Sequence, residues 1–168
     1  MSKRRVVITG LGIVSPVGNG IAEAWDNTIN GRGGIGPITH FDASALPTRF
    51  AGEVKNFNPS DWMSPKEVRR MDTFIHFGIA ATRMAMDDAG LEVTEQNAER
   101  IGVNVGSGIG GLPMIEENIR EMIAKGPRRI SPFFVPGSIV NMVAGMISIL
   151  YGFKGPNEIG RASCRERV

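Results

Sequence analysis

The chain has 168 residues, of which 42% are hydrophobic, and a formal net charge of +2. This length and apolar content suit one ordinary domain that buries its own core. Because the charge is nearly balanced, nucleic-acid binding is not indicated, and any basic binding site must be local. The single cysteine excludes an internal disulfide and suits a reducing cytosol, so a cytoplasmic protein is predicted.

The first third of the chain predicts short elements around a buried strand. Residues 5–9 are apolar and β-branched, as in a strand in the middle of a sheet. Residues 21–30 predict a short helix, residues 31–37 a glycine-rich turn and residues 51–54 an edge strand. Ser64 followed by Pro65 predicts the start of another helix, with the serine as its cap.

Two further segments predict helices that are apolar on almost every side. They span residues 73–89, ended by Gly90, and residues 140–151. Helices of this kind are normally buried on more than one side, so we expect a partner subunit or additional sequence to cover them. The longest apolar stretch, residues 142–153, is too short to span a bilayer.

Residues 101–125 predict a strand, a glycine loop and a helix, which together form one crossover unit of an α/β fold. Gly106, Gly108 and Gly111 spell the dinucleotide pattern GxGxxG, but no strand ending in an acidic residue follows about 20 residues later. Glycines also allow close backbone packing, or can line an apolar pocket. The residues alone leave these three interpretations open, with a nucleotide site the least favoured.

Two groups of cations are closely spaced in the sequence. Lys66, Arg69 and Arg70 lie at helical spacings that place them on one face, and Arg128 and Arg129 form a second basic pair. Such groups are either a solvated surface or a docking site for an acidic partner.

The character of the sequence changes after Asn157. Residues 158–168 have five charged residues in EIGRASCRERV and no apolar period. This segment is either a frayed polar tail or, as we predict, a foreign sequence, because it resembles a translated sequencing-adapter oligonucleotide. On this interpretation residues 1–157 are the natural part of an incomplete domain.

Motifs along residues 1–157 resemble one enzyme family. They are VVITGLGIVSPVGN, FAGEV, RRMDTFIHFGIAA, GSGIGGL, ISPFFVP and VNMVAG with YGFKGPN. The chain is similar over this whole range to bacterial β-ketoacyl-[acyl-carrier-protein] synthase II, the condensing enzyme of fatty-acid elongation. The resemblance implies a thiolase-like αβαβα layered fold, of which this chain would be most of the first half.

The resemblance also implies the chemistry. In the family a cysteine accepts an acyl group as a thioester, and two histidines and a lysine assist decarboxylation of malonyl-carrier protein and attack on that thioester. Cys164 stands at the register of the nucleophile, but the surrounding Ser163, Arg165 and Glu166 do not match the family, and we interpret the match as coincidence. The histidines and the lysine belong to the second half. His40 and His76 are therefore not candidates to replace them, and His76 is expected to be a hydrogen-bonded core residue.

Other positions are assigned by the same resemblance. Ile109 matches a residue at the bottom of the acyl pocket, and Phe134 matches one that borders the partner's pocket across a homodimer. Lys66, Arg69, Arg70, Arg128 and Arg129 match the docking surface for acyl carrier protein. No metal or resident cofactor is implied, because phosphopantetheine arrives on the carrier protein.

We therefore predict a cytoplasmic 3-oxoacyl-[acyl-carrier-protein] synthase, present as an N-terminal fragment that is inactive and aggregation-prone alone. A catalytically silent chain-length-factor-like partner and a polyketide-type ketosynthase remain as alternatives. A nucleotide-binding domain using Gly106–Gly111 is a third.

Overall fold

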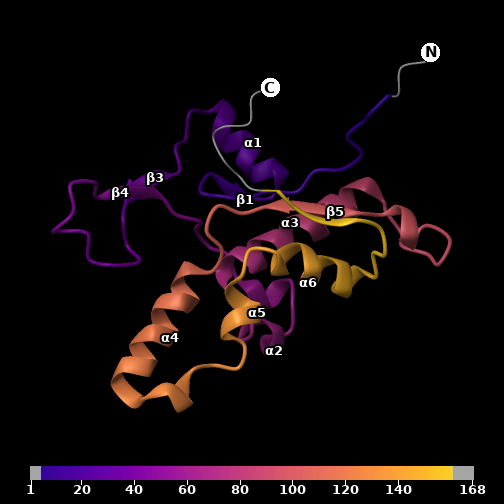
Figure 1. The fold of residues 1–168 in the computed structure, drawn as a ribbon. Helices are drawn as coiled ribbons and strands as arrows, with labels where there is room; N and C mark the ends of the chain where they lie inside the picture. The colour runs from indigo at the N-terminus through magenta and orange to yellow at the C-terminus, as the bar shows by residue number, and fades with distance from the viewer. Residues whose placement is uncertain (1–4, 161–168) are drawn as a thin grey trace. The chain divides into compact units, whose positions relative to one another are not determined.

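A computed structural model describes residues 5–160, which divide into two compact units (Figure 1). Unit 1 contains residues 5–58 and 80–91, and unit 2 contains residues 59–79 and 92–160. Helix α3 (Thr73–Ala89) contributes residues to both units. Within the described residues, none of the helices is both long enough and apolar enough to cross a membrane.

Unit 1 is built from two small antiparallel ladders and one helix. Strand β1 (Val14–Ser15) pairs with β2 (Gly18–Asn19), and helix α1 (Ile21–Ile29) follows directly. Strand β3 (Ile35–Pro37) pairs with β4 (Phe50–Gly52), with Gly36 opposite Ala51. The predicted helix at residues 21–30 is thus confirmed. The edge strand predicted at residues 51–54 is present as β4, at residues 50–52. The turn predicted at residues 31–37 is wrong for residues 35–37, which form β3.

The predicted strand at residues 5–9 is wrong for the described chain. Val6, Val7 and Ile8 are 95%, 66% and 81% exposed, and no described strand pairs with them. Apolar and β-branched composition produces a strand only when a neighbouring strand supplies hydrogen bonds and a face to pack on. The segment that follows lies instead on α3, where a Cβ on Gly12 would overlap the carbonyl oxygen of Ala81.

Unit 2 combines a two-stranded parallel sheet with helices. Its elements are η1 (Pro59–Asp61), α2 (Pro65–Val68), the start of α3, η2 (Ala98–Arg100), β5 (Val103–Gly106), α4 (Leu112–Lys125), η3 (Pro127–Arg129), α5 (Phe134–Ser138), α6 (Met142–Tyr151) and β6 (Asn157–Gly160). Strand β5 pairs in parallel with β6, so that Val103 lies opposite Asn157 and Gly106 opposite Gly160. Helix α6 packs against both strands (Figure 1).

The core of unit 2 forms between α3, α6 and β5. Ile75 and Ile79 of α3 and Val143 and Ile147 of α6 are at most 1% exposed, and they form one cluster with Val103. Gly78 brings the two helices close together, since a Cβ there would lie 2.5 Å from a methyl carbon of Val143. The two apolar helices predicted from the sequence are therefore the helices that build this core.

The helix predicted at residues 73–89 is confirmed to the residue, and Gly90 ends it with a φ of 58°. The helix at residues 112–125 is also confirmed as α4, and the last predicted helix begins at Met142 rather than at residue 140.

Most large apolar side chains of α4 do not face the core of the described chain. Leu112, Ile119, Met122 and Ile123 are 39–78% exposed, and the only buried residue of α4 is polar, Asn118. A helical period shows which residues share a face, and the surrounding elements decide whether that face is covered.

Strand β6 extends into the segment predicted to be foreign, because Glu158 and Ile159 pair with β5. A ladder forms through backbone groups, so residues of either polarity can extend it. Residues 161–168, including Cys164, lie outside the described residues. The foreign origin of the segment stays a prediction.

Candidate functional site

The glycine loop between β5 and α4 brings backbone against backbone. Gly110 has a φ of 88°, and a Cβ there would overlap the carbonyl oxygen of Ser138. A Cβ on Gly111 would lie 2.8 Å from the Cβ of Asp72. Close packing, one of the three interpretations of GSGIGG, is therefore confirmed at these two positions.

The same loop is a poor phosphate cradle, because the N–H groups of Gly110 and Gly111 already have acceptors. Gly110 N donates to Ser107 Oγ at 3.2 Å, and Gly111 N donates to Ser138 O at 2.8 Å. Met114 N, in the first turn of α4, donates to the Asp72 carboxylate at 2.7 Å. A carboxylate thus occupies the place at the helix N-terminus that a phosphate would take. This geometry argues against the nucleotide-binding alternative.

Of the two residues matched to the acyl pocket, Ile109 lies within this loop and Phe134 lies in α5, which packs against it. Ile109 is 69% exposed, and Phe134 is partly buried at the first position of α5. The carbonyl oxygen of Phe134 accepts a hydrogen bond from Ser138 Oγ at 2.6 Å, which fixes the turn of α5 next to Gly110 and Gly111. Their roles toward an acyl chain stay predictions.

The five matched cations form what we call the basic surface: Lys66, Arg69, Arg70, Arg128 and Arg129. All five are exposed, and none of them forms an ion pair with a carboxylate within residues 5–160. The first three lie on or just after α2, and the last two lie in η3.

A capping box stabilises the N-terminus of helix α2. Ser64 Oγ accepts a hydrogen bond from Glu67 N at 3.3 Å, and Glu67 Oε2 accepts one from Ser64 N at 2.9 Å. Ser64 Oγ also donates to Glu67 Oε2 at 2.6 Å, and this bond, followed by the one from Ser64 N, lowers the pKa of Glu67. The predicted start of a helix at Ser64 is therefore confirmed, and the bound Glu67 carboxylate stays at the cap.

The two cation groups meet through an aromatic ring. The guanidinium carbon of Arg70 lies 4.5 Å from the centre of the Phe133 ring, in a cation–π contact. Phe133 caps α5, four residues after Arg129. The contact therefore joins Arg70 of the first cation group to the segment that directly follows the second group, almost sixty residues later in the sequence.

Two buried polar residues beneath this surface were missed by the sequence analysis. Asp72 is 6% exposed and Asn118 is 8% exposed. Asn118 Nδ2 donates to Met114 O at 2.9 Å, and its Oδ1 accepts from Ser131 N at 2.8 Å. The one available signal was an amide between Ile115 and Ile119, at a position where the helical period calls for an apolar side chain.

The two histidines take no part in this surface. His76 is 6% exposed, and its Nε2 lies 3.2 Å from Val68 O. Burial lowers its pKa, and the hydrogen bond with Val68 and the charge of Asp72 oppose that shift. The prediction of a hydrogen-bonded core histidine is confirmed. His40 is exposed, with Nε2 3.9 Å from Glu53.

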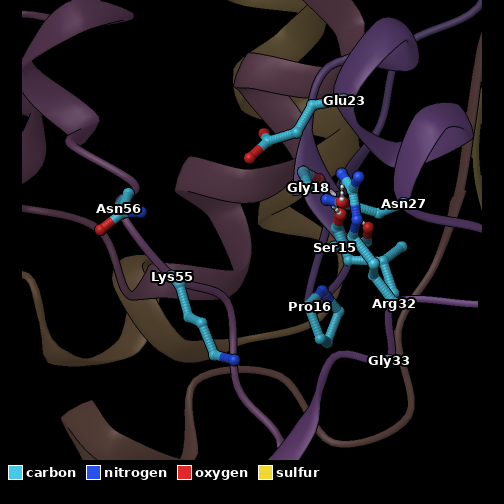
Figure 2. A pocket seen from close by; sticks show the side chains of 10 residues that line it. Ser15, Pro16, Gly18, Glu23, Asn27, Arg32, Gly33, Lys55 and Asn56 are labelled. Atoms are coloured by element: carbon cyan, nitrogen blue, oxygen red, sulfur yellow. Dashed lines mark hydrogen bonds between the residues drawn. The ribbon is translucent and has the colours of Figure 1, made fainter. Parts of the chain in front are cut away.

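Unit 1 contains a separate polar hollow of about 210 Å³ (Figure 2). Several of its lining groups are already bonded within the unit. Asn27 Nδ2 donates to Val17 O at 2.7 Å, Arg32 pairs with Asp26 at 2.8 Å, and Glu23 accepts from Asn19 N at 2.7 Å. These contacts hold the β1–β2 turn against α1, so the hollow is explained by the local fold.

Comparison with known proteins identifies what the chain is similar to. A family described as "Beta-ketoacyl synthase, N-terminal domain" matches residues 3–164. The 3-oxoacyl-[acyl-carrier-protein] synthase 2 of Vibrio harveyi is 55% identical over 98% of this chain. The aligned region is 40% of that relative, so the chain spans about two fifths of its length.

Two solved structures share the fold. The ishigamide ketosynthase/chain length factor matches with a TM-score of 0.83 at 30% identity, covering 95% of this chain and 40% of that one. The AntDE:AntF complex, a type II PKS acyl-carrier protein with its ketosynthase bound to the hexaketide, matches with a TM-score of 0.74 at 25% identity. It covers 90% of this chain and 40% of that one. The predicted α/β fold of the thiolase-like ketosynthases is therefore confirmed.

Proposed function

This chain belongs to the β-ketoacyl synthase family, whose N-terminal domain it carries, and on that premise we propose that it is part of a 3-oxoacyl-[acyl-carrier-protein] synthase of fatty-acid elongation. The identity of 55% to a synthase of that name supports this choice within the family. The parent synthase, as we call it, is this domain joined to the C-terminal portion that the relatives possess.

The proposed reaction is a decarboxylating Claisen condensation. A cysteine thiolate takes the acyl group from one carrier protein, and malonyl-carrier protein loses CO₂. The resulting carbanion attacks the acyl thioester carbon, so a carbon–carbon bond forms and the cysteine thiolate leaves. The thioesters already activate both partners, and the proposal therefore includes no metal and no resident cofactor. The two histidines and the lysine are assigned to the C-terminal portion, and Cys164 marks the register of the nucleophile.

The observation that carries the proposal is the basic surface. Five exposed cations in two segments of unit 2 form no ion pair with a carboxylate among the described residues. Such a surface suits a strongly acidic partner, because opposite potentials steer association and fix its orientation. We propose that Lys66, Arg69, Arg70, Arg128 and Arg129 bind the acyl carrier protein. The AntDE:AntF neighbour pairs a ketosynthase with a carrier protein, which supports this assignment.

The acyl pocket and a homodimer complete the proposal. Ile109 would border the acyl chain, and Phe134 would reach the pocket of the partner subunit. The exposed apolar side chains of α4 support a second copy as the covering partner, since such a face is stabilised by burial. The isolated chain is expected not to condense.

Charge reversal in the parent synthase tests the proposal. Arg69→Glu with Arg70→Glu should raise the KM for acyl-carrier protein at least tenfold, while the KM for an acyl N-acetylcysteamine thioester stays unchanged. Arg100→Glu is the control, because Arg100 is an exposed arginine of unit 2 in η2, which precedes β5, whereas the glycine loop follows that strand. An unchanged KM for acyl-carrier protein in the double variant would remove the docking assignment.

A chain-length-factor-like partner is the second candidate, favoured by the ishigamide neighbour. Such a paralogue lacks the nucleophile. Brief treatment of the parent protein with an acyl-carrier protein, followed by mass spectrometry, distinguishes a synthase from a chain-length-factor-like partner. A synthase forms a covalent acyl thioester, and a silent paralogue does not.

A further inference from the structure

Each cation group of the basic surface is followed in sequence by a residue that is fixed to α4. Asp72 lies two residues after Arg70, and its Oδ2 accepts from Met114 N at 2.7 Å. Ser131 lies two residues after Arg129, and its N–H donates to Asn118 Oδ1 at 2.8 Å. Both groups are thus tied to the same helix.

The two ties are joined within one turn of α4. Met114 and Asn118 are four residues apart and share a face, and Asn118 Nδ2 donates to Met114 O at 2.9 Å. The result is a continuous polar chain from Asp72, through Met114 and Asn118, to Ser131. It spans the distance between the two cation groups inside unit 2.

Burial makes this chain costly to break. Asp72 and Asn118 are both more than nine-tenths buried, and buried polar groups must keep their hydrogen bonds. Asn118 is the only buried residue on α4, while Leu112, Ile119, Met122 and Ile123 of that helix are exposed. Packing alone would favour an apolar residue at this position. The Asn118 side chain instead supplies the acceptor for the backbone N–H of Ser131.

The local structure of η3 explains why a tie is needed. Arg128 and Arg129 lie in a single 3-10 turn of three residues, which Gly126 enters with a φ of 87°. A turn this short has little stability of its own. The hydrogen bond from Ser131 to Asn118 is the first contact after the turn that fixes it to a regular helix.

We infer that Asp72 and Asn118 are positioning residues that hold the two cation groups of the basic surface at one fixed separation, so that the acidic carrier protein contacts both at once. The inference rests on the proposed docking function and adds how the surface is organised. Binding to two cation groups that are already fixed loses less conformational entropy than binding that must first immobilise η3.

Asn118→Ala in the parent synthase is the test, with Asn97→Ala as the matched control. Asn97 also accepts one backbone N–H bond, from Thr94 at 2.7 Å, and donates one to a backbone carbonyl, of Glu92 at 2.9 Å. It lies in unit 2 and does not contact the basic surface. We expect Asn118→Ala to raise the KM for acyl-carrier protein about fivefold, the equivalent of roughly 1 kcal/mol. The kcat and the KM for the N-acetylcysteamine thioester should stay at the wild-type value, and Asn97→Ala should change neither KM.

Two further comparisons separate positioning from mere stability. In a background of Arg128→Ala and Arg129→Ala, Asn118→Ala should have no further effect on KM, because the groups that it positions are gone. Asp72→Ala should raise the same KM selectively, whereas Asp72→Asn keeps an acceptor for Met114 N and should restore it.

Three results would overturn the inference. The first is an equal increase in KM for acyl-carrier protein and for the N-acetylcysteamine thioester. The second is an increase in KM by Asn118→Ala that persists when Arg128 and Arg129 are replaced by alanine. The third is an unchanged KM for acyl-carrier protein in both Asn118→Ala and Asp72→Ala. Failure of the proposed function is distinguishable, because in that case charge reversal at Arg69 and Arg70 also leaves the KM unchanged.

Discussion

The cap of α2 offers a sharp prediction, because a helix of four residues depends strongly on its first turn. Ser64→Ala removes two hydrogen bonds, from Glu67 N to Ser64 Oγ and from Ser64 Oγ to Glu67 Oε2, and leaves the Glu67 carboxylate with only the backbone N–H of residue 64. Loss of an N-cap serine costs about 1 kcal/mol. That energy corresponds to roughly a fivefold shift toward a frayed α2. Lys66 and Arg69 would then lose their fixed placement.

The effect should depend on pH in one direction. The pKa of Glu67 is lowered in the folded state, chiefly by Ser64. The stabilisation is therefore fully present above the ordinary pKa of 4.5 and is lost as pH falls through the lower folded value. Urea unfolding of the parent synthase should show Ser64→Ala less stable at pH 7, with the difference shrinking below pH 4.5.

Two variants serve as controls for this prediction. Ser64→Thr keeps a hydroxyl that can accept from Glu67 N and donate to Glu67 Oε2, and it should remain close to wild type. Glu67→Gln can still close the box but does not titrate, so the part of the pH dependence that Glu67 contributes in this range should be lost. An equal destabilisation by Ser64→Ala at pH 7 and pH 3.5, or none at pH 7, would refute the reasoning.

Three further predictions concern the same unit. Because burial lowers the pKa of His76, stability should be full above pH 6.5 and decline as pH falls below it, and His76→Gln should flatten this decline in melting temperatures. Gly137→Ala should destabilise by about 1–3 kcal/mol, because a Cβ would lie 2.6 Å from both Arg70 O and the Met114 sulfur. Gly145→Ala, where a Cβ meets nothing within 4 Å, is its control in denaturant unfolding. Raising the salt concentration from about 50 to about 500 mM shortens the Debye length and screens the exposed cations. This change should increase the KM for acyl-carrier protein but not the KM for a small thioester.

Helices whose signals are local were predictable from the sequence. The segment at residues 73–89 has a continuous apolar period and a glycine stop, and the structure follows both. The Ser64 cap was equally visible, because its partner Glu67 lies three residues away. In these cases the residues that decide the structure are neighbours in the chain.

Features that depend on distant residues were not predictable in this way. Residues 5–9 have the composition of a strand, yet pairing depends on another segment, and none of the described strands supplies it. The bond between Asp72 and Met114 joins residues 42 positions apart, so no local pattern shows it. For the same reason the basic residues were visible in the sequence, but the polar chain that spaces them was not.

The central claim is that this domain belongs to an enzyme that condenses acyl and malonyl groups held on carrier protein. The most direct measurement incubates the parent synthase with an acyl-carrier protein and malonyl-carrier protein labelled in the carboxyl carbon that leaves. The account predicts one labelled CO₂ released for each 3-oxoacyl-carrier protein formed, its chain two carbons longer. Release of CO₂ without chain extension, or neither product, would contradict it.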